Sequence, residues 1–286
     1  MAAVAPCRFG MSEFTTQPLS FEQDVALYAR LGVDTIEVCE EKLDARRAAD
    51  QLALIRQHGL TISSVQPAVR TLYPSASQPA PHDVAERLSR FRRTIRLCAD
   101  AGTNLAFVTN TGIPPQGNVQ EVVARAAHDY RGLAEFAQEQ GARIALEPLN
   151  ASLMNVESAI WTLEQALEIV AAVDRPNFGI CLDYWNIWQN ADIAEVIAGC
   201  GDRIFVVQVS DWRTPCSFQD RLIPGQGAIP LAPLLRATHQ SGYRGAYAVE
   251  IFSTAVPDAL WEADPAWVIT QSRTGLEAAW RAALAA

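Results

Sequence analysis

Histidine is scarce in this chain, and its cysteines show no pattern. Four histidines occur among 286 residues, mostly in helix-like or loop-like segments, so a zinc site built from histidines is not expected. Six cysteines are present without a CxxC pair or a regular spacing, and Cys39 and Cys181 fall inside apolar runs. We therefore expect reduced, buried thiols and a reducing compartment, the cytoplasm.

Long apolar runs and an excess of positive charge are also missing. No run reaches the roughly 18 apolar residues that cross a bilayer, and the N-terminal segment MAAVAPCRFGMSE does not resemble a signal peptide. The formal net charge is −9, which disfavours a nucleic-acid partner because the phosphate backbone is itself negative. No low-complexity linker divides the chain, so we expect one domain over residues 1–286.

Eight short apolar runs are spread along the whole chain. Near-continuous apolar strands are typical of a parallel sheet that is buried on both faces. The chain lacks the glycine-rich phosphate loop that an open, doubly wound sheet would favour after its first strand. The predicted strands are Cys7–Gly10, Thr35–Cys39, Thr61–Val65, Leu105–Thr109, Arg143–Glu147, Phe178–Asp183, Ile204–Val209 and Ala246–Glu250.

Segments with helical periodicity alternate with these strands. A strand and helix pair recurs roughly every 30 to 40 residues, and eight such units in one domain predict a closed (β/α)8 TIM barrel. The predicted helices include Phe21–Leu31, Val84–Ala101, Val119–Gln138, Ser158–Val173 and Pro230–Gln240, and we expect 257–286 to form the eighth helix. Glycines that fit left-handed helix ends stand at Gly32, Gly59, Gly102, Gly141 and Gly242.

Polar residues end four successive strands in the second half of the chain. They are Glu147, Asp183, Gln208 and Glu250. Active sites of these barrels lie at the carboxyl ends of the strands, and neighbouring strands are only about 4.8 Å apart, so the four side chains can converge. Buried carboxylates need a partner, and oxygen ligands favour a hard divalent ion such as Mg²⁺ or Mn²⁺. Any one of the four residues alone could simply cap a helix or pair with an arginine.

These segments resemble the xylose isomerase-like TIM barrel superfamily, the sugar phosphate isomerase/epimerase group. The resemblance covers nearly the whole chain, and it implies that the four residues bind one Mn²⁺, Mg²⁺ or Co²⁺ ion. It also implies that Glu147 and Glu250 are catalytic and move protons beside a carbonyl, and that Arg213 holds a substrate oxygen. The matching segments are Ile144–Asn150, Phe178–Asp183, Val207–Arg213, Pro224–Gly227 and Tyr247–Ile251.

Two positions depart from the pattern of that family. Gln208 stands where many members have histidine, which resembles the hydroxypyruvate isomerase branch. Asn186 stands where many have a substrate-contacting histidine; asparagine can hydrogen-bond a hydroxyl but cannot carry a proton. Gln66, at the end of the third strand, and Trp185 are further candidates for substrate contact, and Glu37 either pairs with arginine or approaches the substrate.

The leading hypothesis is a metal-dependent isomerase or epimerase acting on a small carbohydrate or hydroxy-ketone. The alternative is a dehydratase of the same superfamily, similar to inosose or 3-dehydroshikimate dehydratases. An endonuclease IV-like enzyme would need several histidines and a basic face, which this acidic chain lacks. A barrel that only binds a ligand would not require the carboxylate set. We expect a small-molecule substrate, no nucleic acid and no membrane, and a homo-oligomer is left open.

Overall fold

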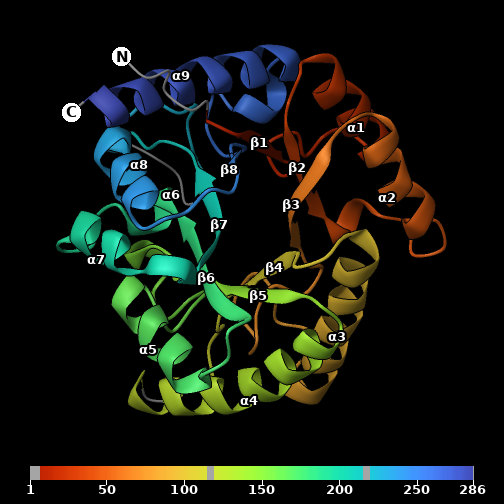
Figure 1. The fold of residues 1–286 in the computed structure, drawn as a ribbon, viewed down its shortest axis with the longest axis vertical. Coiled ribbons are helices and arrows are strands. Elements are labelled where there is room, and N and C mark those ends of the chain that lie inside the picture. The colour runs from red at the N-terminus through yellow and green to blue at the C-terminus, as the bar shows by residue number, and fades with distance from the viewer. Residues whose placement is uncertain (1–6, 115–118, 215–219, 286) are drawn as a thin grey trace.

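A closed ring of parallel strands forms the centre of the computed structural model, which describes residues 7–114, 119–214 and 220–285. Each strand pairs with the next, and the last strand pairs with the first, so the predicted (β/α)8 barrel is confirmed. The helices surround this ring (Figure 1). The strands are β1 (Phe9–Ser12), β2 (Thr35–Cys39), β3 (Thr61–Gln66), β4 (Ala106–Thr109), β5 (Arg143–Leu146), β6 (Phe178–Asp183), β7 (Ile204–Val209) and β8 (Tyr247–Val249).

The helices follow the strands in the expected order, with additional short turns. Helix α9 packs against α8, and its Trp280 is buried beside Tyr247, as expected for the helix that completes the barrel. The helices are α1 (Phe21–Arg30), α2 (Ala48–Gln57), α3 (Val84–Ala101), α4 (Val119–Glu139), α5 (Leu163–Val173), α6 (Tyr184–Ile187), α7 (Ile193–Gly199), α8 (Leu231–Gln240) and α9 (Pro265–Ala285), and single 3-10 turns lie at Glu40–Lys42, Ala151–Leu153, Gly201–Arg203 and Leu260–Glu262.

Four local predictions differ from the structure, apart from element ends that shift by a single residue. The last helix begins at Pro265 rather than at residue 257. The first strand begins at Phe9 rather than Cys7. Helix α5 begins after Thr162 rather than at Ser158, because Thr162 and Gln165 form a capping box that fixes the start of the helix. Gly102 has φ 168°, which is extended backbone, so it is not a left-handed helix end.

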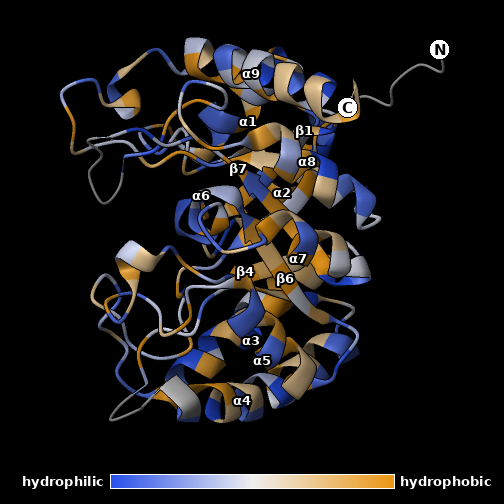
Figure 2. Ribbon diagram, turned by 90° about the vertical axis from the view of Figure 1, so that its left-hand side faces the viewer, coloured by the Kyte–Doolittle hydropathy of each residue, from blue (hydrophilic) through white to orange (hydrophobic). Residues whose placement is uncertain are grey.

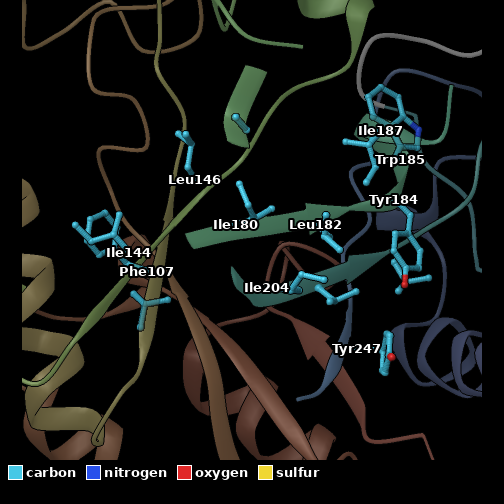
Figure 3. Close-up of a cluster of buried hydrophobic side chains, with 14 of the residues drawn as sticks. Phe107, Ile144, Leu146, Ile180, Leu182, Tyr184, Trp185, Ile187, Ile204 and Tyr247 are labelled. Carbon is cyan, nitrogen blue, oxygen red and sulfur yellow. The ribbon is translucent and has the colours of Figure 1, made fainter. Parts of the chain in front are cut away.

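The two faces of the strands bury different side chains. Successive side chains in a strand point to opposite faces, so Ile180 and Leu182 of β6 pack outward in the large core beneath the helices (Figure 3). The alternate residue Cys181 packs inside the ring in a separate small cluster with Ala145 and Val206. Asp183, two residues beyond Cys181, therefore points inward as well.

Long loops extend from one end of the barrel, on the left in Figure 2. The loop from 67 to 83, between β3 and α3, is one of these long connections. The described residues include no helix long and apolar enough to span a membrane. Cys39 and Cys181 are buried free thiols, as expected, and Cys216 lies outside the described residues.

A buried acidic pair lies behind the end of β1. Glu13 is fully buried, and its Oε2 accepts a 2.7 Å hydrogen bond from the Cys39 amide. Asp24 lies next to it and pairs with Lys42 at 2.6 Å. Burial and the neighbouring Asp24 raise the pKa of Glu13 well above its ordinary value of 4.5. Folded protein therefore binds a proton at Glu13 over a pH range in which unfolded protein has released it.

This linkage predicts that the free energy of unfolding falls as pH rises above about 4.5, because the unfolded state then releases the proton that native Glu13 keeps. One such proton contributes a slope of up to about 1.4 kcal/mol per pH unit. Glu13→Gln, which stays neutral, should flatten the pH dependence of the free energy of unfolding, measured with urea, above about pH 5. Glu22→Gln on the exposed face of α1 is the control, and equal slopes in both variants would contradict the assignment.

Candidate active site

The four strand-end residues lie together at the end of the barrel that carries the long loops. Asp183 ends β6 and Gln208 is the penultimate residue of β7, while Glu147 and Glu250 directly follow β5 and β8. All four side chains are buried. The convergence predicted from the sequence is therefore present in the structure.

A cavity of about 170 Å³ opens above this cluster. Glu147 and Glu250 line it, whereas Asp183 and Gln208 lie below its surface. The remaining lining comes from loops on several sides of the ring, and it includes the predicted candidates Gln66, Trp185 and Asn186. The lining residues are Phe14, Gln66, Arg70, Thr71, Ser77, Gln78, Asn110, Glu147, Leu149, Leu153, Glu157, Trp185, Asn186, Arg221, Glu250 and Phe252.

Arg221 is the functional residue that the sequence analysis missed. Its Nη1 lies 2.8 Å from Asp183 Oδ2 and 2.8 Å from Glu250 Oε2. The side chain is 9% exposed, and its guanidinium carbon stands 4.9 Å from the Trp185 ring centroid and 5.0 Å from that of Phe252. Such cation–π contacts stabilise a desolvated guanidinium. The only sequence signal was a cation three residues before the Pro224-Gly225 turn.

Arg213, the arginine predicted to hold substrate, lies elsewhere in the same loop. Its side chain is 38% exposed and pairs with Asp258 at 2.5 Å and with Asp220 at 3.7 Å. It does not appear among the residues that line the cavity. The structure therefore brings Arg221, rather than Arg213, to the strand-end carboxylates.

Asn186 connects two of the carboxylates. Its Nδ2 donates to Glu147 Oε1 at 2.8 Å and to Asp183 Oδ2 at 2.9 Å, and its Oδ1 accepts from the Asn150 amide. Asn150 in turn donates to the carbonyl oxygen of Trp185. These bonds tie the loop after β5 to helix α6, so Asn150 supports the loop and Asn186 holds Glu147 beside Asp183.

Gln208 connects the cluster to Glu37 of β2. Its Nε2 donates to Glu37 Oε1 at 2.9 Å and to Glu250 Oε1 at 2.8 Å, while its Oε1 accepts from Cys181 Sγ at 3.2 Å. Ser64 donates to the second oxygen of Glu37 at 2.6 Å. Glu37 thus contacts neither arginine nor the cavity, and it fixes the orientation of the Gln208 amide.

Burial perturbs the acids of this site strongly. Burial, and then the charge of Asp183, raise the pKa of Glu147 to about 8. Burial likewise raises the pKa of Glu250 and of Asp183, although Arg221 opposes the rise in both. Burial alone would lower the pKa of Arg221, but the surrounding carboxylates raise it above its ordinary value. Perturbed acids of this kind at a cavity are typical of active sites.

The charges of the cluster leave room for a further cation. Glu37, Glu147, Asp183 and Glu250 are all buried, and within the described part of the chain the cation among them, Arg221, pairs with two of the four, Asp183 and Glu250. Carboxylate oxygens suit a hard divalent ion, so the three strand-end acids are ligands of the right type for a metal. In the arrangement shown, however, no three acidic, histidine or cysteine side chains among the described residues are placed to hold one. Gln208 would have to turn, because it now presents its NH₂ group rather than its oxygen to the cluster.

Asp211 organises the loop that delivers Arg221. It is fully buried just after β7, and its two carboxylate oxygens accept hydrogen bonds from four backbone amides, those of Trp212, Gly225, Gly227 and Ile229, each at 2.9 Å. Its backbone pairs with Leu222, the neighbour of Arg221. A Cβ on Gly227 would lie 2.3 Å from the carbonyl oxygen of Trp212, so glycine is required at this close approach.

Three tryptophans, Trp185, Trp188 and Trp212, follow β6 and β7 near the site. Trp185 does line the cavity and contacts Arg221. Trp188 and Trp212 contact each other, with ring centroids 5.6 Å apart, and do not appear in the cavity lining. The aromatic wall of the cavity therefore consists of Trp185 with Phe14 and Phe252.

A family model described as xylose isomerase-like TIM barrel matches residues 25–271. The chain belongs to this family. It is 25% identical over 248 residues to an inosose isomerase of Bacillus velezensis, which covers 83% of this chain and 85% of that protein. It is 32% identical over 180 residues to a 3-dehydroshikimate dehydratase of Pseudomonas aeruginosa, but this match covers 59% of the chain and only 27% of the dehydratase.

A solved structure agrees with this assignment of the fold. A crystal structure described as an IolI protein with a binding zinc atom superposes with a TM-score of 0.80 at 22% identity. The match covers 95% of this chain and 97% of that one. The relatives are sugar-type isomerases and dehydratases, which places the chain in a family of enzymes.

The role of Asp211 predicts a large effect of Asp211→Ala. The substitution leaves four backbone N–H groups without their hydrogen-bond acceptor. It should therefore lower the free energy of unfolding, measured by urea denaturation, by about 2–4 kcal/mol. Asp202→Ala, at a fully exposed aspartate, is the control and should change stability by less than about 0.5 kcal/mol. Equal stability of the two variants would show that the loop does not depend on Asp211.

Proposed function

We propose that the protein is a divalent-metal-dependent isomerase or epimerase of a small sugar, inosose or hydroxy-ketone. The observation that carries the proposal is that two buried carboxylates, Glu147 and Glu250, border one cavity from separate strand ends. Each is held by amide donors, Glu147 by Asn186 and Glu250 by Gln208 and Gln66. Two positioned acids are the machinery needed to remove a proton beside a carbonyl and return it.

Glu147, Asp183, Gln208 and Glu250 would hold the ion, one of Mn²⁺, Mg²⁺ or Co²⁺. When bound, the ion would polarise the carbonyl and hydroxyl oxygens of the substrate and so favour its enediolate form. The carboxylates of Glu147 and Glu250 would transfer the proton at the neighbouring carbon. Trp185, Phe14 and Phe252 would exclude water from that carbon. Gln66 would donate to a substrate hydroxyl, and Asn186, which also lines the cavity, would contact the substrate beside Glu147.

The first test is the metal content and activity of two neutral variants. Glu147→Gln and Glu250→Gln should each lose the single equivalent of Mn²⁺ that wild type binds. In a ketose and inosose panel run in D₂O, both should lower kcat by at least about 100-fold, together with deuterium incorporation into product. Glu157→Gln is the matched control for metal content, because Glu157 lines the cavity but bonds to Ser77. A wild type that takes up no Mn²⁺ would overturn the metal-dependent mechanism.

A dehydratase is the second candidate, favoured by Arg70. Arg70 lines the cavity, and its guanidinium lies over the Phe14 ring. Among the described residues, its ion-pair partner is the half-exposed Glu41, at 3.1 Å. A partly free cation at this position suits a substrate that carries a carboxylate, as 3-dehydroshikimate does. Elimination would use the same Glu147 and Glu250 but expel a hydroxyl group as water.

Arg70→Met separates the two candidates. If the substrate is a hydroxy-acid, the variant should raise KM by at least about tenfold, since a charge-assisted bond contributes roughly 1.5–3 kcal/mol. KM for a neutral inosose should stay unchanged. A new ultraviolet absorbance from the more unsaturated product of water loss would identify dehydration directly. Arg213→Met, which removes the exposed arginine, is the control and tests whether that residue contacts substrate at all.

A further inference from the structure

The position of Arg221 bears directly on how this site handles a metal ion. Its Nη1 is 2.8 Å from one oxygen of Asp183 and 2.8 Å from one oxygen of Glu250. Carboxylate oxygens bind a divalent metal at about 2.0–2.6 Å. A nitrogen within hydrogen-bonding distance of both oxygens therefore stands in the space that an ion bridging them would fill.

The second oxygens of these two acids are already engaged. Asp183 Oδ1 accepts from the Trp185 amide at 3.0 Å, and Glu250 Oε1 accepts from Gln208 and Gln66. Arg221 holds Glu250 Oε2 and Asp183 Oδ2, of which the latter also accepts from Asn186 at 2.9 Å. An ion that used these two oxygens would therefore meet the guanidinium. Two cations at that distance also repel each other in a buried site.

The main chain at Arg221 is fixed, but its side chain has room to move. The Arg221 amide donates to the Phe252 carbonyl at 2.7 Å, and Leu222 is paired with Asp211, so the loop stays in place. The guanidinium borders the cavity and lies against the faces of Trp185 and Phe252. A change of side-chain rotamer alone can carry it away from the acids and into the cavity.

We infer that Arg221 and a divalent metal ion compete for Asp183 Oδ2 and Glu250 Oε2. The guanidinium is the counter-ion of the metal-free site and is displaced when the metal binds. This inference rests on the proposed metal site. It has two consequences: the protein folds without metal, because the acids already have a cation, and its metal affinity is lower than the three carboxylates alone would give.

The experiment compares Mn²⁺ binding in wild type and Arg221→Gln after chelator treatment, with free Mn²⁺ measured by electron paramagnetic resonance. Arg221→Gln should bind Mn²⁺ at least about tenfold more tightly, since a competing charge has been removed. Without metal its Tm should lie below that of wild type, and saturating Mn²⁺ should raise its Tm by more than that of wild type. Arg213→Gln, an exposed arginine of the same loop, is the matched control and should bind Mn²⁺ as wild type does.

Arg221→Lys covers the case in which the glutamine variant does not fold. The shorter ammonium keeps the charge but cannot hold both oxygens as the guanidinium does, so its Mn²⁺ affinity should fall between those of wild type and Arg221→Gln. If wild type binds Mn²⁺ and both variants bind it equally or more weakly, competition is overturned while the metal site stands. If neither wild type nor any variant binds Mn²⁺, the inference and the metal part of the proposed function fail together.

Discussion

The active-site end of this barrel depends on keeping several buried carboxylates in one place. An unpaired buried charge is very unfavourable, yet Glu37, Glu147, Asp183 and Glu250 are all buried together. Their oxygens are held by donors from every side, including the guanidinium of Arg221. The side-chain amides of Asn186 and Gln208 therefore stabilise the structure, because their hydrogen bonds offset the repulsion between the buried acids.

The requirement extends outward from the acids to the loop after β7. Arg221 can act as counter-ion only if its main chain is fixed. Four backbone amides of the loop donate hydrogen bonds to Asp211, and the Arg221 amide donates to the Phe252 carbonyl, so the main chain is held in place. The aromatic rings of Trp185 and Phe252 then shield the guanidinium. Asp211, a buried aspartate outside the cavity lining, thus holds the loop that places Arg221 beside the acids.

Strand-end residues could be predicted from the sequence, and loop residues could not. The alternation of apolar strands places Asp183, Gln208 and the glutamates by simple counting, because strand periodicity and barrel closure fix their direction. The position of Arg221 depends on hydrogen bonds between residues ten or more positions apart, and such bonds produce no periodic pattern in the sequence. The resemblance therefore pointed to Arg213, which is nearer the strand. The prediction of a left-handed residue at Gly102 was also wrong. Gly102 follows a helix, as such residues do, but Asn104, with φ 58°, adopts the left-handed conformation instead.

Gln208 and Glu37 form one arrangement, and the pair explains why an amide suits this position. A neutral imidazole carries a single N–H, whereas the NH₂ group of glutamine donates two hydrogen bonds. Gln208 uses both, one to Glu37 and one to Glu250. A histidine here would leave one of these buried carboxylates without its donor unless it became protonated. Glutamine at position 208, where the resemblance implies histidine in many members, is therefore matched to Glu37. The pair links β2 to the site, although Glu37 does not line the cavity.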